Sequence, residues 1–120
     1  MSASAFRYGS AIVLSVFLCG ARPQAVRMTA DDYYWRGKEK YHNGDFAGAV
    51  QEYDKAAKLA PDVARIFGSR GAAKRKLGDK EGALEDARKA ARLGDRDAQR
   101  ILGILGYSWD KNEESRSGKP

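Results

Sequence analysis

The sequence predicts an all-α protein, a short solenoid in which two helical hairpins are followed by one closing helix. Three observations support this fold class: a 34-residue internal repeat, a Gly-Asp pair inside each copy, and alanines spaced seven residues apart in each second half. A fixed period of this length is typical of stacked repeats. Twelve of the 34 aligned pairs are identical: Ala30/Ala64, Arg36/Arg70, Gly37/Gly71, Lys40/Lys74, Gly44/Gly78, Asp45/Asp79, Gly48/Gly82, Ala49/Ala83, Lys55/Lys89, Ala56/Ala90, Ala57/Ala91 and Leu59/Leu93.

The first repeat, residues 30–63, contains the signals of two helices. Thr29 precedes two aspartates, a pattern typical of a capped helix start with acids in its first turn. We expect this helix to run to about Asn43. Gly44 then supplies a C-terminal glycine and Asp45 an N-cap for a second helix that ends before Pro61. The apolar stripe of the second helix comprises Phe46, Ala49, Val50, Tyr53, Ala56, Ala57 and Leu59.

The second repeat, residues 64–97, follows the same plan with smaller side chains. We expect Asp62 to cap its first helix, whose apolar positions include Leu77. Gly78-Asp79 forms the turn, and a helix rich in alanine follows. Because these core side chains are smaller, the second repeat is expected to bury less apolar area and to be less stable than the first.

Gly37 and Gly71 lie inside the predicted first helices, where a glycine costs about 1 kcal/mol relative to alanine. A glycine that recurs at such a position needs a compensating reason. Close approach of a partner helix is the simplest one, so we expect each glycine to lie in a helix–helix contact.

The closing helix is predicted for residues 98–107, after the Gly94-Asp95 break. A terminal helix of a stack should carry one polar face, yet few polar residues occur between Ile101 and Tyr107. We expect this helix to pack fully on the second repeat, and the alternative is that it docks another chain. Residues 108–120 are polar and are expected to form a disordered tail.

Residues 1–21 differ in composition from the rest and are predicted to be a signal peptide or N-terminal hydrophobic leader, with residues 22–29 as a linker. One basic residue, Arg7, is followed by an uncharged run over residues 8–21. That run fits a signal-peptide core and is shorter than the roughly 20 apolar residues of a membrane span. Export to the periplasm or to the exterior is therefore expected. The alternatives are an uncleaved anchor through residues 8–21 or a lipid on Cys19, which the large Leu18 before it disfavours.

Composition limits the chemistry of the chain. At 120 residues it holds one domain, and its 42% hydrophobic and 32% charged residues are ordinary for a folded helical protein. One cysteine and one histidine cannot make a metal cluster, and no cofactor is expected. No nucleophile–base pair, phosphate loop or paired carboxylates are present, so the chain is not expected to be an enzyme. Its net charge of +6 leaves an electrostatic nucleic-acid or anionic-surface binder as the alternative function.

The repeat resembles the tetratricopeptide repeat family. The residues that match its pattern are Tyr33 and Phe67, Gly37 and Gly71, Ala49 and Ala83, Tyr53 and Pro61. The pattern is broken where Arg36 and Arg70 replace leucine, where Lys40 and Lys74 replace tyrosine, and where Ala87 and Asp95 replace the later aromatic residue and the proline. The resemblance implies a right-handed α-solenoid that serves as a non-catalytic scaffold or adaptor for protein partners. Because two repeats and one helix are close to the minimum length of a stable stack, we also expect self-association or stabilisation by a partner.

The resemblance also implies where a partner would bind. In the family, the first helices of the repeats line a concave groove. Tyr33 is expected in the core, whereas the off-core tyrosines and nearby cations are expected in the groove, where they would favour acidic peptides. A clamp for a terminal carboxylate is not expected, because Tyr34 and Gly68 stand where it needs polar groups. The predicted protein-binding residues are Tyr34, Lys38, Tyr41, Arg75 and Lys76.

Overall fold

The computed structural model describes residues 26–110, and this part of the chain contains five helices and no strand. The predicted leader, most of the predicted linker and the tail beyond Asp110 lie outside the described residues. No helix among residues 26–110 has the length and apolar character needed to cross a membrane. The helices are α2 (Ala30–His42), α3 (Phe46–Leu59), α4 (Ala64–Lys76), α5 (Lys80–Arg92) and α6 (Arg96–Ile104).

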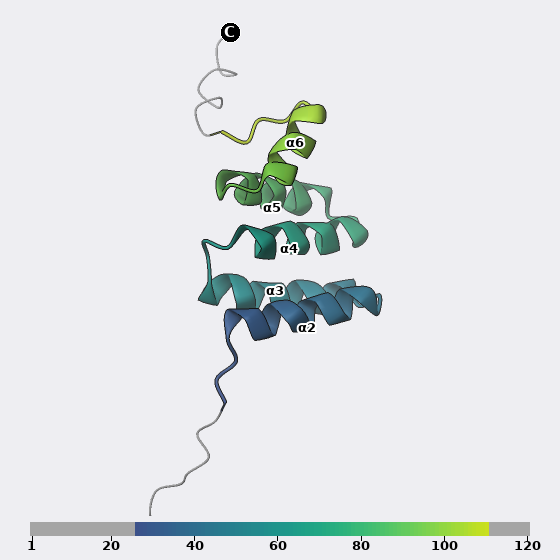
Figure 1. Cartoon of the computed structure of the whole chain (residues 1–120). Helices are drawn as coiled ribbons and strands as arrows, with labels where there is room; N and C mark the ends of the chain where they lie inside the picture. Colours follow the sequence, from purple (N-terminus) through teal and green to yellow (C-terminus); the bar gives the residue numbers. More distant parts are fainter. Residues whose placement is uncertain (1–25, 111–120) are drawn as a thin grey trace, which may run out of the picture.

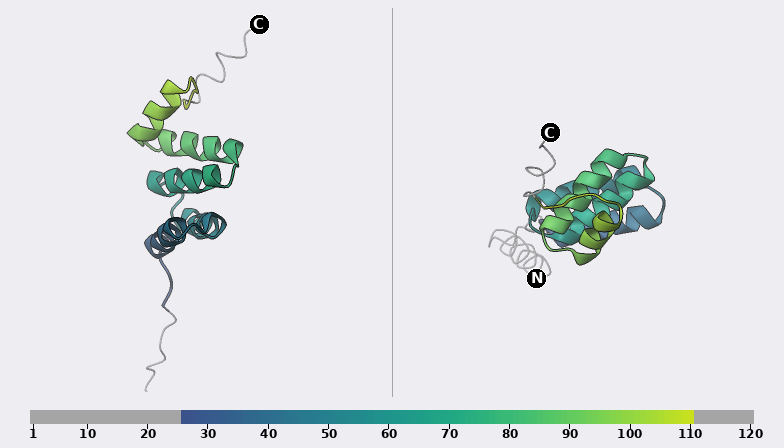
Figure 2. Two further views of the ribbon diagram at one scale, coloured as in Figure 1. Left: turned by 90° about the vertical axis from the view of Figure 1, so that its right-hand side faces the viewer. Right: turned by 90° about the horizontal axis from the view of Figure 1, so that it is seen from above.

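The five helices form a helical-hairpin solenoid, as predicted. α2 pairs with α3 and α4 with α5, and the two hairpins stack on one another through α3 and α4 (Figure 1). α2 also contacts α4, and α6 packs on α5 at the end of the stack. In the side view α6 is inclined to α5 instead of lying along it (Figure 2).

The helix boundaries follow from local capping chemistry. Thr29 and Asp32 form a complete capping box at the start of α2, and the hydrogen bonds from Thr29 lower the pKa of the Asp32 carboxyl. Asp45 and Asp79 cap α3 and α5 by accepting from the backbone N–H three residues ahead. Gly44 and Gly78 have φ of 82° and 85°, a left-handed conformation that favours glycine at these turns.

The predicted Asp62 cap is wrong. The N-cap of α4 is Val63, which makes no side-chain capping bond, because the turn that contains Pro61 is longer than the Gly-Asp turns and places the aspartate one residue too early.

Both interior glycines lie where the second helix of the hairpin comes closest. A Cβ on Gly37 would stand 2.6 Å from Cε1 of Tyr53. A Cβ on Gly71 would stand 3.1 Å from the carbonyl oxygen of Ala83 and from Cβ of Asp86. The prediction of a close helix–helix contact at both glycines is therefore confirmed.

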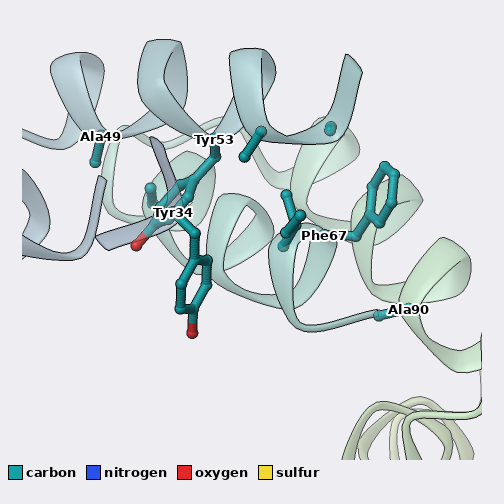
Figure 3. Close-up of a cluster of buried hydrophobic side chains, with 9 residues drawn as sticks. Tyr34, Ala49, Tyr53, Phe67 and Ala90 are labelled. Atoms are coloured by element: carbon teal, nitrogen blue, oxygen red, sulfur yellow. The ribbon is translucent and has the colours of Figure 1, made fainter. Parts of the chain in front are cut away.

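The core runs through both hairpins and is built mainly from tyrosine, phenylalanine and alanine (Figure 3). Tyr53 is the largest fully buried side chain, and burial raises the pKa of its hydroxyl to about 12. Leu59 and Leu77, predicted as apolar core positions, are 58% and 51% exposed. Leu59 is the last residue of α3 and Leu77 follows α4, so both lie beyond the packed turns.

α6 departs most from its prediction. It is shorter than expected, ends at Ile104, and buries one hydrophobic side chain fully, that of Leu102. The expectation that it packs fully on the second repeat is wrong. Four large hydrophobic residues at and after its C-terminal half remain exposed: Ile101, Ile104, Leu105 and Tyr107.

Candidate functional site

The first helices of the repeats can be compared residue by residue. α4 begins 34 residues after α2, whereas α6 begins 32 residues after α4. The second interval is shorter because α5 and the loop after it are each one residue shorter than α3 and the loop after α3. Residues 35, 69 and 101 therefore occupy one position of the repeat, and residues 38, 72 and 104 occupy another. We call the solvent side of α2 and α4 at these positions the first-helix face.

The α2 part of this face presents an aromatic ring and a cation. Trp35 is 60% exposed, and its ring packs edge-on against Tyr34 with 5.5 Å between centroids. Nζ of Lys38 lies 5.7 Å from the centroid of the Trp35 ring. An ammonium group over an indole is attracted to the negative face of the ring. The pair thus offers an apolar surface with a positive charge beside it.

Tyr34 and Tyr41 lie deeper than predicted. Tyr34 is 8% exposed and belongs to the core, so its predicted place off the core face is wrong. The cause is the packing of α2 against both α3 and α4: Tyr34 lies against Tyr53 of α3, and the guanidinium of Arg65 in α4 lies 4.9 Å from the centroid of its ring. Tyr41 is half-buried against Phe46, with 5.2 Å between ring centroids. Their role as partner contacts stays a prediction, restricted to the edges that remain accessible.

Arg75 and Lys76 supply the α4 part of the face. Both are exposed, and neither forms an ion pair within residues 26–110. They lie in the last turn of α4, close to backbone carbonyls that favour positive charge. The residues of α4 at the two positions that define this face, Ser69 and Ala72, are small and half-buried. The predicted Gly68 lies beside the carboxylate of Asp95, because a Cβ on this glycine would be 3.7 Å from Oδ2.

Two other cations of α4 have a structural role instead. Arg70 donates from Nε and Nη2 to both carboxylate oxygens of Asp86, at 2.9 and 2.7 Å, and from Nη1 to Asp54 at 2.7 Å. Lys74 lies 3.1 Å from Asp86 as well. The hydrogen bond to Asp86 is the main reason that the pKa of Arg70 is raised. This ionic cluster joins α3, α4 and α5, so these cations are not available to a partner.

The sequence analysis missed the ionic cluster, although a signal for it exists. Glu52 precedes Asp86 by 34 residues, so an acid faces the same arginine and lysine positions in each hairpin. In the first hairpin the cluster is not formed. Arg36 donates to Sδ of Met28, Glu52 pairs with Lys55 at 3.3 Å, and Oε2 of Glu52 is buried without a hydrogen-bond partner.

The described residues form a small helical-repeat structure with a core of helix–helix contacts and with apolar and basic residues exposed to solvent. Comparison with known proteins indicates the family that the first hairpin resembles. Residues 30–63 match the tetratricopeptide repeat model, and the second hairpin repeats its geometry. The chain is also 42% identical over 48 residues to the heat shock protein sti1 homolog of Schizosaccharomyces pombe, an alignment that covers 40% of this chain and 8% of that protein. Residues 30–63 are thus similar to tetratricopeptide repeats, which typically belong to non-catalytic scaffolds and generally mediate protein–protein interaction.

Of the predicted site residues, the structure brings Lys38 of α2 and Arg75 and Lys76 of α4 to the solvent side of adjacent first helices. The most exposed aromatic side chain of α2, Trp35, was not among them. Helical periodicity places Trp35 one position from Tyr34, and the sequence does not show which of two neighbouring aromatic residues a crossing helix will cover.

Proposed function

We propose that this chain is a protein-interaction module that binds a segment of a partner polypeptide along the first-helix face. One observation supports this function above the others: a large aromatic residue, Trp35, stays exposed beside cations that have no acidic partner within the described chain. Exposed apolar patches with polar rims are typical of protein-binding sites. Tryptophan and arginine are also the residues that most often dominate binding energy at protein interfaces.

Each side chain has a distinct role in this proposal. Trp35 contributes apolar area, and the accessible edges of Tyr34 and Tyr41 extend it. Lys38, Arg75 and Lys76 attract carboxylates of the partner. The small residues of α4 allow the bound backbone to come close. A partner segment rich in acidic and apolar residues therefore fits this face best.

The experiment is in-cell photo-crosslinking of a tagged full chain, followed by identification of the captured protein. Arg75→Glu with Lys76→Glu should abolish capture, and Trp35→Ala should reduce it at least tenfold, since central tryptophans often contribute about 2 kcal/mol or more. The matched control is Lys58→Glu with Lys80→Glu, the same change of charge on exposed residues of the second helices. Equal loss with the control pair, or full capture by both Arg75→Glu and Trp35→Ala variants, contradicts the proposal.

Salt dependence separates this function from binding to nucleic acid. A protein that neutralises several phosphates loses affinity steeply as salt rises. A face that combines Trp35 with three cations should lose affinity mildly. Titration of the purified partner at about 50 and 200 mM salt makes the distinction.

We further propose that residues 1–21 direct export of the chain and that the repeat region acts outside the cytosol. The uncharged run over residues 8–21 supports this proposal. Cell fractionation and sequencing of the mature N-terminus test it. An intact Met1 on a protein that stays in the cytoplasm would overturn it.

A further inference from the structure

α6 corresponds to the first helix of a repeat, and no second helix covers it within residues 26–110. The residues of α2 that pack against α3 lie along one stripe of α2. Tyr34 and Gly37 contact Tyr53, and Tyr41 contacts Phe46. The same positions on and just after α6 are Arg100, Gly103 and Tyr107. Arg96, Arg100, Gly103 and Ile104 form a stripe on α6, and Tyr107 lies just beyond it, after the left-handed Gly106. We call these five residues the end stripe.

The part of the end stripe on α6 is open to solvent in the described chain, whereas the ring of Tyr107 has the guanidinium of Arg88 in α5 at 5.7 Å from its centroid. A Cβ built on Gly103 would have no atom within 4 Å, whereas the same atom on Gly37 would meet a tyrosine ring at 2.6 Å. Ile104 is 77% exposed and Tyr107 is about half exposed. α6 is also the last helix of the stack, and the side that it turns away from α5 faces outward (Figure 2).

We propose that the end stripe binds one amphipathic helix of another protein, which takes the place that α3 takes on α2. That helix would lay a large apolar or aromatic side chain over Gly103, as Tyr53 lies over Gly37. Its other apolar residues would cover Ile104 and Tyr107. Helices that come this close need a glycine at the crossing, and Gly103 is already in place.

Charge indicates the chemistry of the partner helix. Arg96 and Arg100 are exposed at one end of the stripe, and the single ion pair that they make in the described chain is Arg100 with Asp97 at 3.3 Å. An acidic residue on the partner helix would pair with them. A second copy of this chain is disfavoured, because two end stripes in contact would bring four arginines together. Residues 111–120 carry no aliphatic or aromatic side chain and do not provide the helix.

The probe is a synthetic peptide with the α3 sequence, residues 45–60, in which Lys55 and Lys58 are replaced by Glu. In the first hairpin this part of α3 lies beside the start of α2, because Nζ of Lys55 lies over the ring of Tyr33. A peptide that binds α6 in the same way would place the two new glutamates near Arg96 and Arg100 at the start of α6. The unmodified peptide, with both lysines, is the matched control. Binding is followed by amide chemical-shift perturbation in the isotope-labelled full chain and by fluorescence anisotropy of the peptide.

The acidic peptide is expected to shift the amides of residues 96–107 and to bind at least about tenfold more tightly than the lysine peptide, an effect that corresponds to about 1.4 kcal/mol. Gly103→Ala should weaken it about tenfold or more, because the added methyl separates the helices. The same substitution should leave the free chain folded, because its Cβ enters open space. Trp35→Ala should leave this binding unchanged, which separates it from binding at the first-helix face.

Several outcomes would overturn the proposal. They are shifts confined to α2 and α4, equal affinity for the two peptides, and unchanged affinity of the Gly103→Ala variant. Concentration-dependent shifts at residues 96–107 without peptide would mean that a second copy occupies the stripe. Loss of the α6 signals on anionic vesicles, with no response to either peptide, would assign the stripe to a lipid surface.

Discussion

Replacing Arg70 by alanine should destabilise the protein far more than the same change at Arg36, although the two residues occupy one position of the repeat. Arg70 makes three charge-assisted hydrogen bonds and is 18% exposed, and its main partner Asp86 is 5% exposed. Arg36 is exposed and donates to a methionine sulfur. Both changes replace an arginine inside a helix by alanine, so the helix propensities cancel in the comparison.

The magnitude follows from what Asp86 loses. Breaking a buried ion pair by removing one partner costs about 3–5 kcal/mol. Lys74 remains 3.1 Å from Asp86 and Asp54 is half-exposed, so we expect a loss at or below the lower end of that range, about 2–3 kcal/mol. Arg36→Ala should change the free energy of unfolding by less than about 0.5 kcal/mol, as is usual for surface positions.

Urea unfolding of the two variants and the parent chain measures this difference. The midpoint should fall strongly for Arg70→Ala and hardly at all for Arg36→Ala, with equal slopes in all three proteins. A loss below about 0.5 kcal/mol in Arg70→Ala itself would refute the assignment of Arg70 as the link between the hairpins. An equal, large loss at Arg36 would mean that Arg36 pairs with Glu52 in solution and completes a second ionic cluster.

Two further predictions concern packing and titration. Gly37→Ala should destabilise the protein by about 1–3 kcal/mol, because the new Cβ overlaps the Tyr53 ring. Gly103→Ala should stabilise it by up to about 1 kcal/mol through helix propensity alone. Thermal unfolding of the two variants measures the difference, and equal shifts of the melting temperature would contradict the close contact at Gly37. Burial raises the pKa of Tyr53 from 10.0 to about 12, so the folded state keeps the hydroxyl neutral at a pH where the unfolded chain ionises it. The free energy of unfolding should therefore not change with this group below pH 10, and should fall by up to about 3 kcal/mol as the pH rises from 10 to 12. Urea unfolding measured from pH 9 to 12 should show this loss of stability in the parent chain and a smaller loss in Tyr53→Phe. An equal dependence of stability on pH in the two proteins would contradict the raised pKa of Tyr53.

The fold could be predicted from the sequence because it depends on spacing and on local chemistry. The Gly-Asp turns, the capping box at Thr29 and the interior glycines act over three or four residues or repeat at a fixed interval, and each was confirmed. Asp62 failed as a cap because one extra turn residue moved the helix start. That shift of one residue lies within the uncertainty of any helix boundary inferred from sequence.

The candidate site was less predictable because it depends on how helices cross. Tyr33, Tyr34 and Trp35 are adjacent and chemically similar, yet the crossing of α2 with α3 and α4 buries one and exposes another. The ionic cluster around Arg70 draws on three helices separated by 16 residues in each direction. Contacts of this kind follow from tertiary geometry, which no short stretch of sequence specifies.

The two ends of the stack differ in a way that bears on function. On α4 the positions that pack towards the preceding hairpin include Ile66 and Ala73, both buried. On α2 the same positions are Asp32 and Glu39, both exposed, so the first hairpin presents a polar surface to solvent. The last helix carries exposed aliphatic residues instead. Because a stack of this length is close to the minimum for stability, a partner that covers α6 would raise the free energy of unfolding of the whole chain, and binding and folding would be coupled.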